Sequence, residues 1–210
     1  MRLIAHAAPP ASGLSASGGA RSIAKAIAAG ECVPDQALRT RAGEIARREG
    51  VAGKVHAGGA WQEPHVHAQL AAALDARLGR ALRVEFEWYY CRGAFFHNDA
   101  HYDARLFGVW CIEGPPMEIV FPRAMMRLAV ASGSIVVFDP FEVHGVLAPG
   151  RSTYAASDYQ CAATSVFLGF ELDITPAIAG AFDIQDGASG HMISSRTRID
   201  ATSGAIKSFD

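Results

Sequence analysis

The sequence predicts a mainly β protein of the α+β class, an antiparallel sandwich or jelly roll with helices packed on one face. Three observations support this prediction. Short apolar runs separated by Gly- and Pro-containing turns fill residues 82–174. Helical periodicity is confined to the residues before them. Half of the 210 residues are hydrophobic, so the chain can bury a sizeable core.

The first part of the chain, residues 1–80, is expected to be an extension with supporting helices. Residues 1–20 are rich in Ala, Gly, Ser and Pro and predict a loosely held leader with one short strand at 2–5. Helices are expected over 21–30 and 35–49. A third is expected from residue 61 or 63 to 78, where apolar residues recur every four positions and Gly79 ends the helix: Val66, Leu70, Leu74 and Leu78.

The β region begins at residue 82. In LRVEFEWYY (82–90) the apolar residues alternate with charged ones, which predicts a half-buried strand with Leu82, Val84, Phe86 and Trp88 on the core side. Further strands are expected at 105–112, 117–121, 126–130, 134–138, 144–148 and 165–174. We therefore expect a β core over 81–180 and a polar tail over 181–210 that can form a hairpin, all within one domain.

Composition excludes several classes of protein. The net charge of −2 and the absence of a basic stripe argue against a nucleic-acid partner. No apolar run approaches the roughly 20 residues that a membrane helix needs, so no membrane association is expected. Four cysteines without CxxC spacing favour a reduced, cytoplasmic protein: Cys32, Cys91, Cys111 and Cys161. The oligomeric state cannot be inferred from the sequence.

The residues with a chemical signature lie in two segments. His97-Asn98-Asp99 places two potential ligands on the same side of an extended chain, because residues i and i+2 share a face. His144 follows the apolar strand of GSIVVFDPFEVH (133–144). Two histidines and one aspartate on one side of a metal leave its other side open, which suits non-haem iron(II) and oxygen chemistry. His101-Tyr102-Asp103 is an overlapping alternative for the first two ligands.

These motifs, in this order, resemble the double-stranded β-helix core of the 2-oxoglutarate- and iron(II)-dependent dioxygenases. The resemblance covers residues 82–174 and includes the Gly-led apolar strand that ends near His144. It implies an Fe(II) site of His97, Asp99 and His144, and a hydroxylase that takes O2 and a small-molecule or side-chain substrate.

The resemblance also favours His97 and Asp99 over His101 and Asp103. The first pair follows Gly93-Ala-Phe-Phe, as in the small-plus-aromatic lead-in of the family. It also leaves room for a turn before the strand near Leu106. His101 and Asp103 would then lie beside the site.

The family's 2-oxoglutarate needs a basic residue after the second histidine, and Arg151 is the nearest one. Arg105, Arg123 and Arg127 are alternative anchors. Two other functions remain open: a cupin-like metalloenzyme that does not use 2-oxoglutarate, and a non-enzymatic β-sandwich that binds a ligand.

Overall fold

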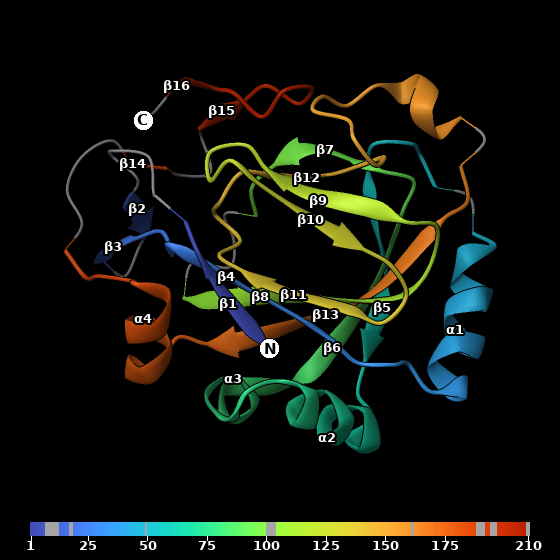
Figure 1. Cartoon of the computed structure of the whole chain (residues 1–210), viewed down its shortest axis with the longest axis horizontal. Coiled ribbons are helices and arrows are strands. Elements are labelled where there is room, and N and C mark those ends of the chain that lie inside the picture. The colour runs from blue at the N-terminus through green and yellow to red at the C-terminus, as the bar shows by residue number, and fades with distance from the viewer. Residues whose placement is uncertain are drawn as a thin grey trace.

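The computed structural model of the chain describes residues 1–6, 13–16, 19–48, 50–99, 104–160, 162–187, 192–193 and 197–208. In this part of the chain the fold is mainly β, with large antiparallel sheets and four α-helices. The architecture agrees with the predicted sandwich or jelly roll (Figure 1).

Two antiparallel sheets of the described chain enclose the interior. The order is β1-β4-β11-β8-β13-β6-β5 in the seven-stranded sheet and β10-β9-β12-β7 in the four-stranded sheet. Their strands are β1 (Arg2–Ala5), β4 (Ala26–Glu31), β5 (Val55–Trp61), β6 (Leu82–Cys91), β7 (Ala94–His97), β8 (Arg105–Glu113), β9 (Met117–Phe121), β10 (Met126–Val130), β11 (Ser134–Phe138), β12 (His144–Leu147) and β13 (Ser165–Asp173). Smaller sheets contain β2 (Gly13–Ala16), β3 (Gly19–Ser22), β14 (Met192–Ile193), β15 (Arg198–Ile199) and β16 (Ile206–Ser208).

The inner strands of the seven-stranded sheet, such as β8, β11 and β13, are buried on both faces. Along β8, Phe107 and Cys111 belong to the cluster between the two sheets, whereas Leu106 and Trp110 belong to the cluster beneath the helices. This alternation follows from the two-residue period of a strand. It explains why the strand sequences contain long apolar runs.

The helices cover the outer face of the seven-stranded sheet (Figure 1). They are α1 (Gln36–Ala46), α2 (Pro64–Ala73), α3 (Ala76–Ala81) and α4 (Pro176–Phe182), with a 3₁₀ turn η1 (Ala156–Tyr159). Asp35 caps α1 by accepting a hydrogen bond from the Leu38 backbone N–H at 2.8 Å. Each helix buries a short apolar stripe, such as Leu38, Ala42 and Ile45 of α1.

Two helix predictions are wrong. Residues 21–30 do not form a helix: β3 ends at Ser22, and β4 lies between β1 and β11, pairing with both. Pairing on two sides outweighs the helix preference of an Ala-rich segment. The single helix expected up to residue 78 is instead α2 and α3, separated at Leu74 and Asp75, and Gly79 lies within α3. Trp61 ends the strand β5, which the sequence analysis did not predict.

Val84 was predicted to face the core, yet it is 63% exposed. The pairing of β6 with β13 is irregular here, since Phe86 pairs with Phe170 and Leu82 with Leu172. Three residues of β6 therefore oppose one residue of β13, which breaks the strict alternation. Leu82, Phe86 and Trp88 are buried as expected.

The C-terminal segment covers the outer face of the four-stranded sheet. β15 and β16 pair as a short antiparallel hairpin. The Phe96 backbone N–H donates to the Ala201 carbonyl at 2.9 Å, and Ile199 and Ile206 pack beside buried Phe96 and Val120. Among the described residues, no helix has the length and apolar character required to cross a bilayer.

Candidate metal centre

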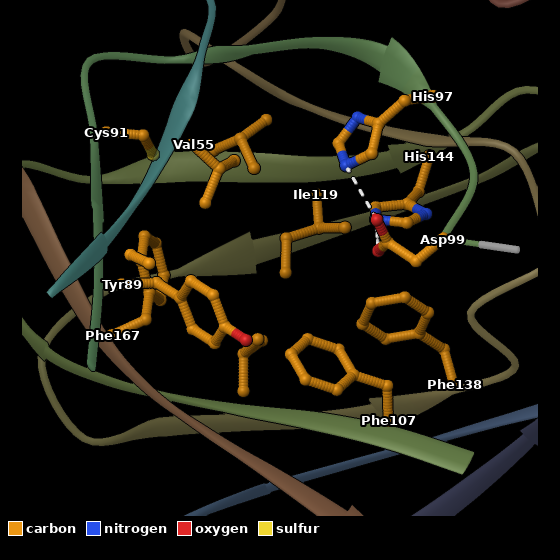
Figure 2. A pocket seen from close by; sticks show the side chains of 13 residues that line it. Val55, Tyr89, Cys91, His97, Asp99, Phe107, Ile119, Phe138, His144 and Phe167 are labelled. Carbon is orange, nitrogen blue, oxygen red and sulfur yellow. Dashed lines mark ion pairs between the residues drawn. The ribbon is translucent and has the colours of Figure 1, made fainter. Parts of the chain in front are cut away.

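His97, Asp99 and His144 lie together at one end of the space between the two sheets (Figure 2). His97 ends β7, Asp99 follows two residues later, and His144 begins β12. One potential ligand atom from each residue lies within 4.8 Å of the others. The alternative residues His101 and Asp103 fall outside the described part of the chain.

An irregularity in β7 turns His97 into the interior. In the pairing of β7 with β12, His97 lies opposite His144 and Ala94 lies opposite Val146, so β7 has one residue more than its partner. Such a bulge reorients the side chains beyond it. Ala94 therefore packs between the sheets while His97 also reaches the interior.

Backbone carbonyls hold both histidines in the same tautomer. Nδ1 of His97 lies 2.7 Å from the Phe95 carbonyl oxygen, and Nδ1 of His144 lies 2.9 Å from the Glu142 carbonyl oxygen. A carbonyl can only accept, so Nδ1 is the donor in each ring. Nε2 then carries the free lone pair, as a metal ligand requires.

The two Nε2 atoms face the Asp99 carboxylate. His97 Nε2 lies 3.8 Å from Oδ1, and His144 Nε2 lies 3.6 Å from Oδ2. The imidazole rings are 4.4 Å apart between centroids. His144 is 5% exposed. Burial, with a further contribution from His97 and against the opposing effect of Asp99, lowers the pKa of His144 to about 4. His144 is therefore neutral at pH 7 and able to ligate.

The loop between β11 and β12 contacts the backbone of Asp99 and the ring of His144. The Pro140 carbonyl accepts the Asp99 backbone N–H at 2.8 Å. Buried Asp139 accepts hydrogen bonds from the Ala24 backbone N–H at 3.0 Å and from Arg21 Nη1 at 2.6 Å. Because the same loop supplies the carbonyl that orients His144, the Arg21–Asp139 pair anchors the backbone that positions two of the three candidate ligands.

A cavity of about 270 Å³ opens beside the three residues. Its volume is near the small end of the range for ligand pockets, roughly 300–1,000 Å³. Val55 lines it and is also 43% exposed, so the cavity reaches the surface at β5. Apart from the candidate ligands and Cys91, its described walls are aromatic or aliphatic: Tyr89, Phe107, Phe138, Phe167, Val55, Ala57, Val109, Ile119 and Val146.

The donor set fits a divalent metal ion. Two neutral imidazole nitrogens and one carboxylate are the ligands of the non-haem iron(II) facial site, in which the remaining positions stay open. Adjacent ligands at about 2.1 Å from a metal lie about 3 Å apart, so the distances of 3.8 and 3.6 Å between the imidazole Nε2 atoms and the Asp99 carboxylate would each have to close by less than about 1 Å. The cavity lies directly beside the three residues (Figure 2).

The arginines proposed as anchors for 2-oxoglutarate lie elsewhere. The Arg151 side chain is 58% exposed and donates to Asp158 at 2.7 Å. Arg105 pairs with Glu171, and Arg127 pairs with Glu118. Arg123 faces Glu142, and its charge lowers the pKa of that carboxyl, although burial dominates and raises it to about 7. None of these four residues lines the cavity.

Sequence reasoning also left out several residues that build the cavity. Val55 and Ala57 belong to β5, whose Gly-rich sequence VHAGGAW carries no alternation typical of a strand. Phe107 and Phe138 lie on predicted strands, and their inward orientation could have been deduced from the strand period once the register was known. Of the aromatic residues near the motifs, Trp88 and Trp110 are core residues, whereas Tyr89 lines the cavity.

No protein-family model matches the chain, and no curated protein matches it. Weak likenesses exist among solved structures. A prolyl-4-hydroxylase from Pseudomonas putida shares 17% identity over 71% of this chain and 93% of that chain, with a TM-score of 0.39. The polyketide cyclase RemF from Streptomyces resistomycificus shares 16% identity over 68% and 78%, with a TM-score of 0.32. A prolyl 4-hydroxylase structure from Phytophthora capsici shares 16% over 73% and 49%, with a TM-score of 0.29. At TM-scores below 0.5, these likenesses carry no argument about this chain.

Proposed function

We propose that this protein is a non-haem iron(II) oxygenase with His97, Asp99 and His144 as its metal ligands. One observation carries the proposal: two imidazoles with free Nε2 atoms and one carboxylate meet at one end of an otherwise apolar cavity. This donor set is the one that non-haem iron oxygenases use. When bound, iron(II) would supply the activation of O2, for which amino-acid side chains have no equivalent.

The strand arrangement supports a double-stranded β-helix as the finer description of the fold. The eight strands β6 to β13 divide between two four-strand orders, β11-β8-β13-β6 and β10-β9-β12-β7. His144 begins β12 and His97 ends β7, which are neighbours in the smaller sheet, and Asp99 follows β7 by two residues. A rigid sheet holds catalytic groups more accurately than a loop does.

The described residues have three tasks in this proposal. The Phe95 and Glu142 carbonyls hold the histidines in the ligating tautomer. The Asp139–Val143 loop fixes the backbone at Asp99 through the Pro140 carbonyl. The aromatic walls, Phe107 and Phe138 among them, would exclude water from the cavity beside the three ligand residues.

2-Oxoglutarate is the co-substrate that the sequence resemblance implies. Besides its keto acid, this molecule carries a far carboxylate that needs a basic partner. The described walls of the cavity contain neither Lys nor Arg. Outside the described part of the chain, Arg196 is the only Lys or Arg. The walls therefore do not fit 2-oxoglutarate as well as the three ligands fit iron.

That observation favours a second candidate, a cupin-like metalloenzyme on the same kind of jelly roll that does not use 2-oxoglutarate. Both candidates require the metal centre. Only the first candidate would consume 2-oxoglutarate together with O2.

Oxygen consumption by iron-loaded protein tests the proposal. The protein is loaded anaerobically with Fe(II) and mixed with O2 in the presence and absence of 2-oxoglutarate, and O2 uptake and succinate are measured together. Succinate formed in step with O2 uptake, and lost in Asp99→Ala, supports the 2-oxoglutarate-dependent enzyme. Iron binding without succinate supports the second candidate, and a chain that binds no iron contradicts both.

A further inference from the structure

The walls of the cavity indicate the chemical class of its ligand. We propose that the cavity receives an uncharged apolar group, of about the size of one aromatic ring or a short aliphatic chain, and excludes dicarboxylates. This inference rests on the proposed function only for the role of the ligand as substrate; the binding itself is a property of the cavity.

Four rings dominate the walls, from Tyr89, Phe107, Phe138 and Phe167 (Figure 2). The Phe107 and Phe138 rings meet edge to face with centroids 5.9 Å apart, and Phe138 lies 4.6 Å from the His144 ring. The aromatic wall therefore continues up to the candidate ligands. A small apolar group held against these rings gains burial and ring contacts together.

In its described part, the far wall contains no Lys or Arg that could pair with an anion. Tyr89 lies across the cavity from the candidate ligands (Figure 2). Its hydroxyl donates a hydrogen bond to Glu87 Oε2 at 2.6 Å. A carboxylate placed there would find the Tyr89 proton engaged by the Glu87 carboxylate and no Lys or Arg among the described wall residues. Taking a carboxylate out of water without a partner is strongly unfavourable.

Close packing fixes the shape of this wall. Gly169 of β13 lies between Tyr89 and Phe107, and a Cβ atom at this position would come within 2.4 Å of the Tyr89 ring. The absence of a side chain at residue 169 lets both rings fill the space between the sheets. No room is left there for a long basic side chain, and the neighbouring inward residue of the same strand is Phe167.

Probe binding by the whole chain tests the inference without any turnover. Indole and cyclohexanol serve as uncharged probes, and 2-oxoglutarate and succinate as dicarboxylates. A blocked phenylalanine dipeptide presents the same apolar group as a side chain. Saturation-transfer NMR and calorimetric titration are run on metal-free protein and on protein loaded with Mn(II), which avoids oxidation.

Pocket-filling variants locate the binding. Ile119→Trp fills the cavity from the smaller sheet, and Val55→Trp fills it from the exposed edge, where folding is less at risk. Val84→Trp is the matched control, because Val84 is 63% exposed and lies outside the cavity. We expect the two filling variants to weaken probe binding about tenfold or more and the control to leave it unchanged within about twofold.

Saturable binding of an uncharged probe, with neither dicarboxylate binding at millimolar concentration, supports the inference. Tighter binding of the dipeptide than of the free probes would assign the apolar group to a peptide, and the reverse would assign it to a small molecule. Saturable binding of 2-oxoglutarate to the Mn(II) form, or no probe binding by the folded wild type, overturns it. Failure to bind any metal would contradict the proposed function but would leave the probe result on metal-free protein decisive for the cavity.

Discussion

Each candidate ligand is held by its own contacts at the residue scale. The histidine tautomers depend on backbone carbonyls, which mutation of a neighbouring side chain does not remove. Among the described residues, in contrast, no group donates a hydrogen bond to the Asp99 carboxylate. Its nearest partners are the Nε2 atoms of His97 and His144, at 3.8 and 3.6 Å. Charge pairing with a metal ion would supply the partner that the carboxylate needs.

The choice between the two His-X-Asp pairs is a residue-scale prediction. We expect His97→Ala to abolish high-affinity Fe(II) binding and His101→Ala to retain it, because Nε2 of His97 faces Asp99 and His144 lies beside it. Metal analysis after anaerobic loading and desalting measures the difference. Loss of iron in His101→Ala with retention in His97→Ala would reverse the assignment.

Cys91 and Cys111 should be poor nucleophiles in the folded protein. Burial raises the pKa of each thiol to about 12, with a further contribution from Cys111 at Cys91. At pH 8, four units lower, about one thiol in 10⁴ is ionised. We expect slow alkylation by iodoacetamide that accelerates about tenfold per pH unit as the thiolate forms, read by peptide mass spectrometry. Rapid modification of folded protein at pH 8 would show that these thiols are not buried as described.

At the scale of elements, the Asp139–Val143 loop links the metal centre to the N-terminal strands. Arg21 lies in β3 and Asp139 follows β11, so their ion pair joins distant parts of the sequence. The pair is nearly inaccessible, with side-chain exposures of 11% and 1%. Removal of one partner would leave a buried charge without its counterion.

We expect Arg21→Met to lower the free energy of unfolding by about 3–5 kcal/mol and to weaken metal binding at the same time. The matched control is Arg83→Met, which breaks an exposed pair with Asp173 and should cost less than about 1 kcal/mol. Urea unfolding and metal titration of both variants provide the measurements. If both substitutions changed the free energy of unfolding and metal binding equally, the Arg21–Asp139 pair would not anchor the loop that positions the metal ligands.

The elements also show what the sequence could predict. The strands from β6 to β13 other than β7 were predicted nearly to the residue, because apolar runs and Gly or Pro turns mark them locally. β4, β5 and β7 were missed, since their small or mixed residues form strands only through pairing with distant partners. The candidate ligands could be predicted from local spacing, whereas the lack of Lys and Arg among the described walls of the cavity depends on how the sheets assemble.

At the scale of the whole molecule, the candidate site lies in the middle of four layers. Helices cover one sheet, the cavity lies between the sheets, and the C-terminal segment covers the other sheet (Figure 1). The smaller sheet carries His97 and His144 on its inner side. The C-terminal segment on its outer face therefore helps to hold the two histidines in position.

Removal of residues 197–210 should therefore destabilise the molecule and the site together. The deletion would uncover Phe96 and Val120, which are 3% and 6% exposed, and would remove the acceptor for the Phe96 N–H. Exposure of each such side chain costs about 1.5–3 kcal/mol. Ile206→Ala is the milder variant, with a smaller loss expected from the same contact. Thermal unfolding followed by circular dichroism measures both, and an unchanged midpoint in the deletion would show that this cover contributes nothing.

Stoichiometric metal binding tests the central claim most directly. Anaerobic calorimetric titration with Fe(II) should show about one tight site per chain in the wild type. The same titration should show no tight site in Asp99→Ala or His144→Ala, while both variants keep the far-UV spectrum of the folded protein. A wild-type chain that binds no Fe(II), or folded variants that bind it as tightly as the wild type, would contradict the assignment of His97, Asp99 and His144 as a metal centre.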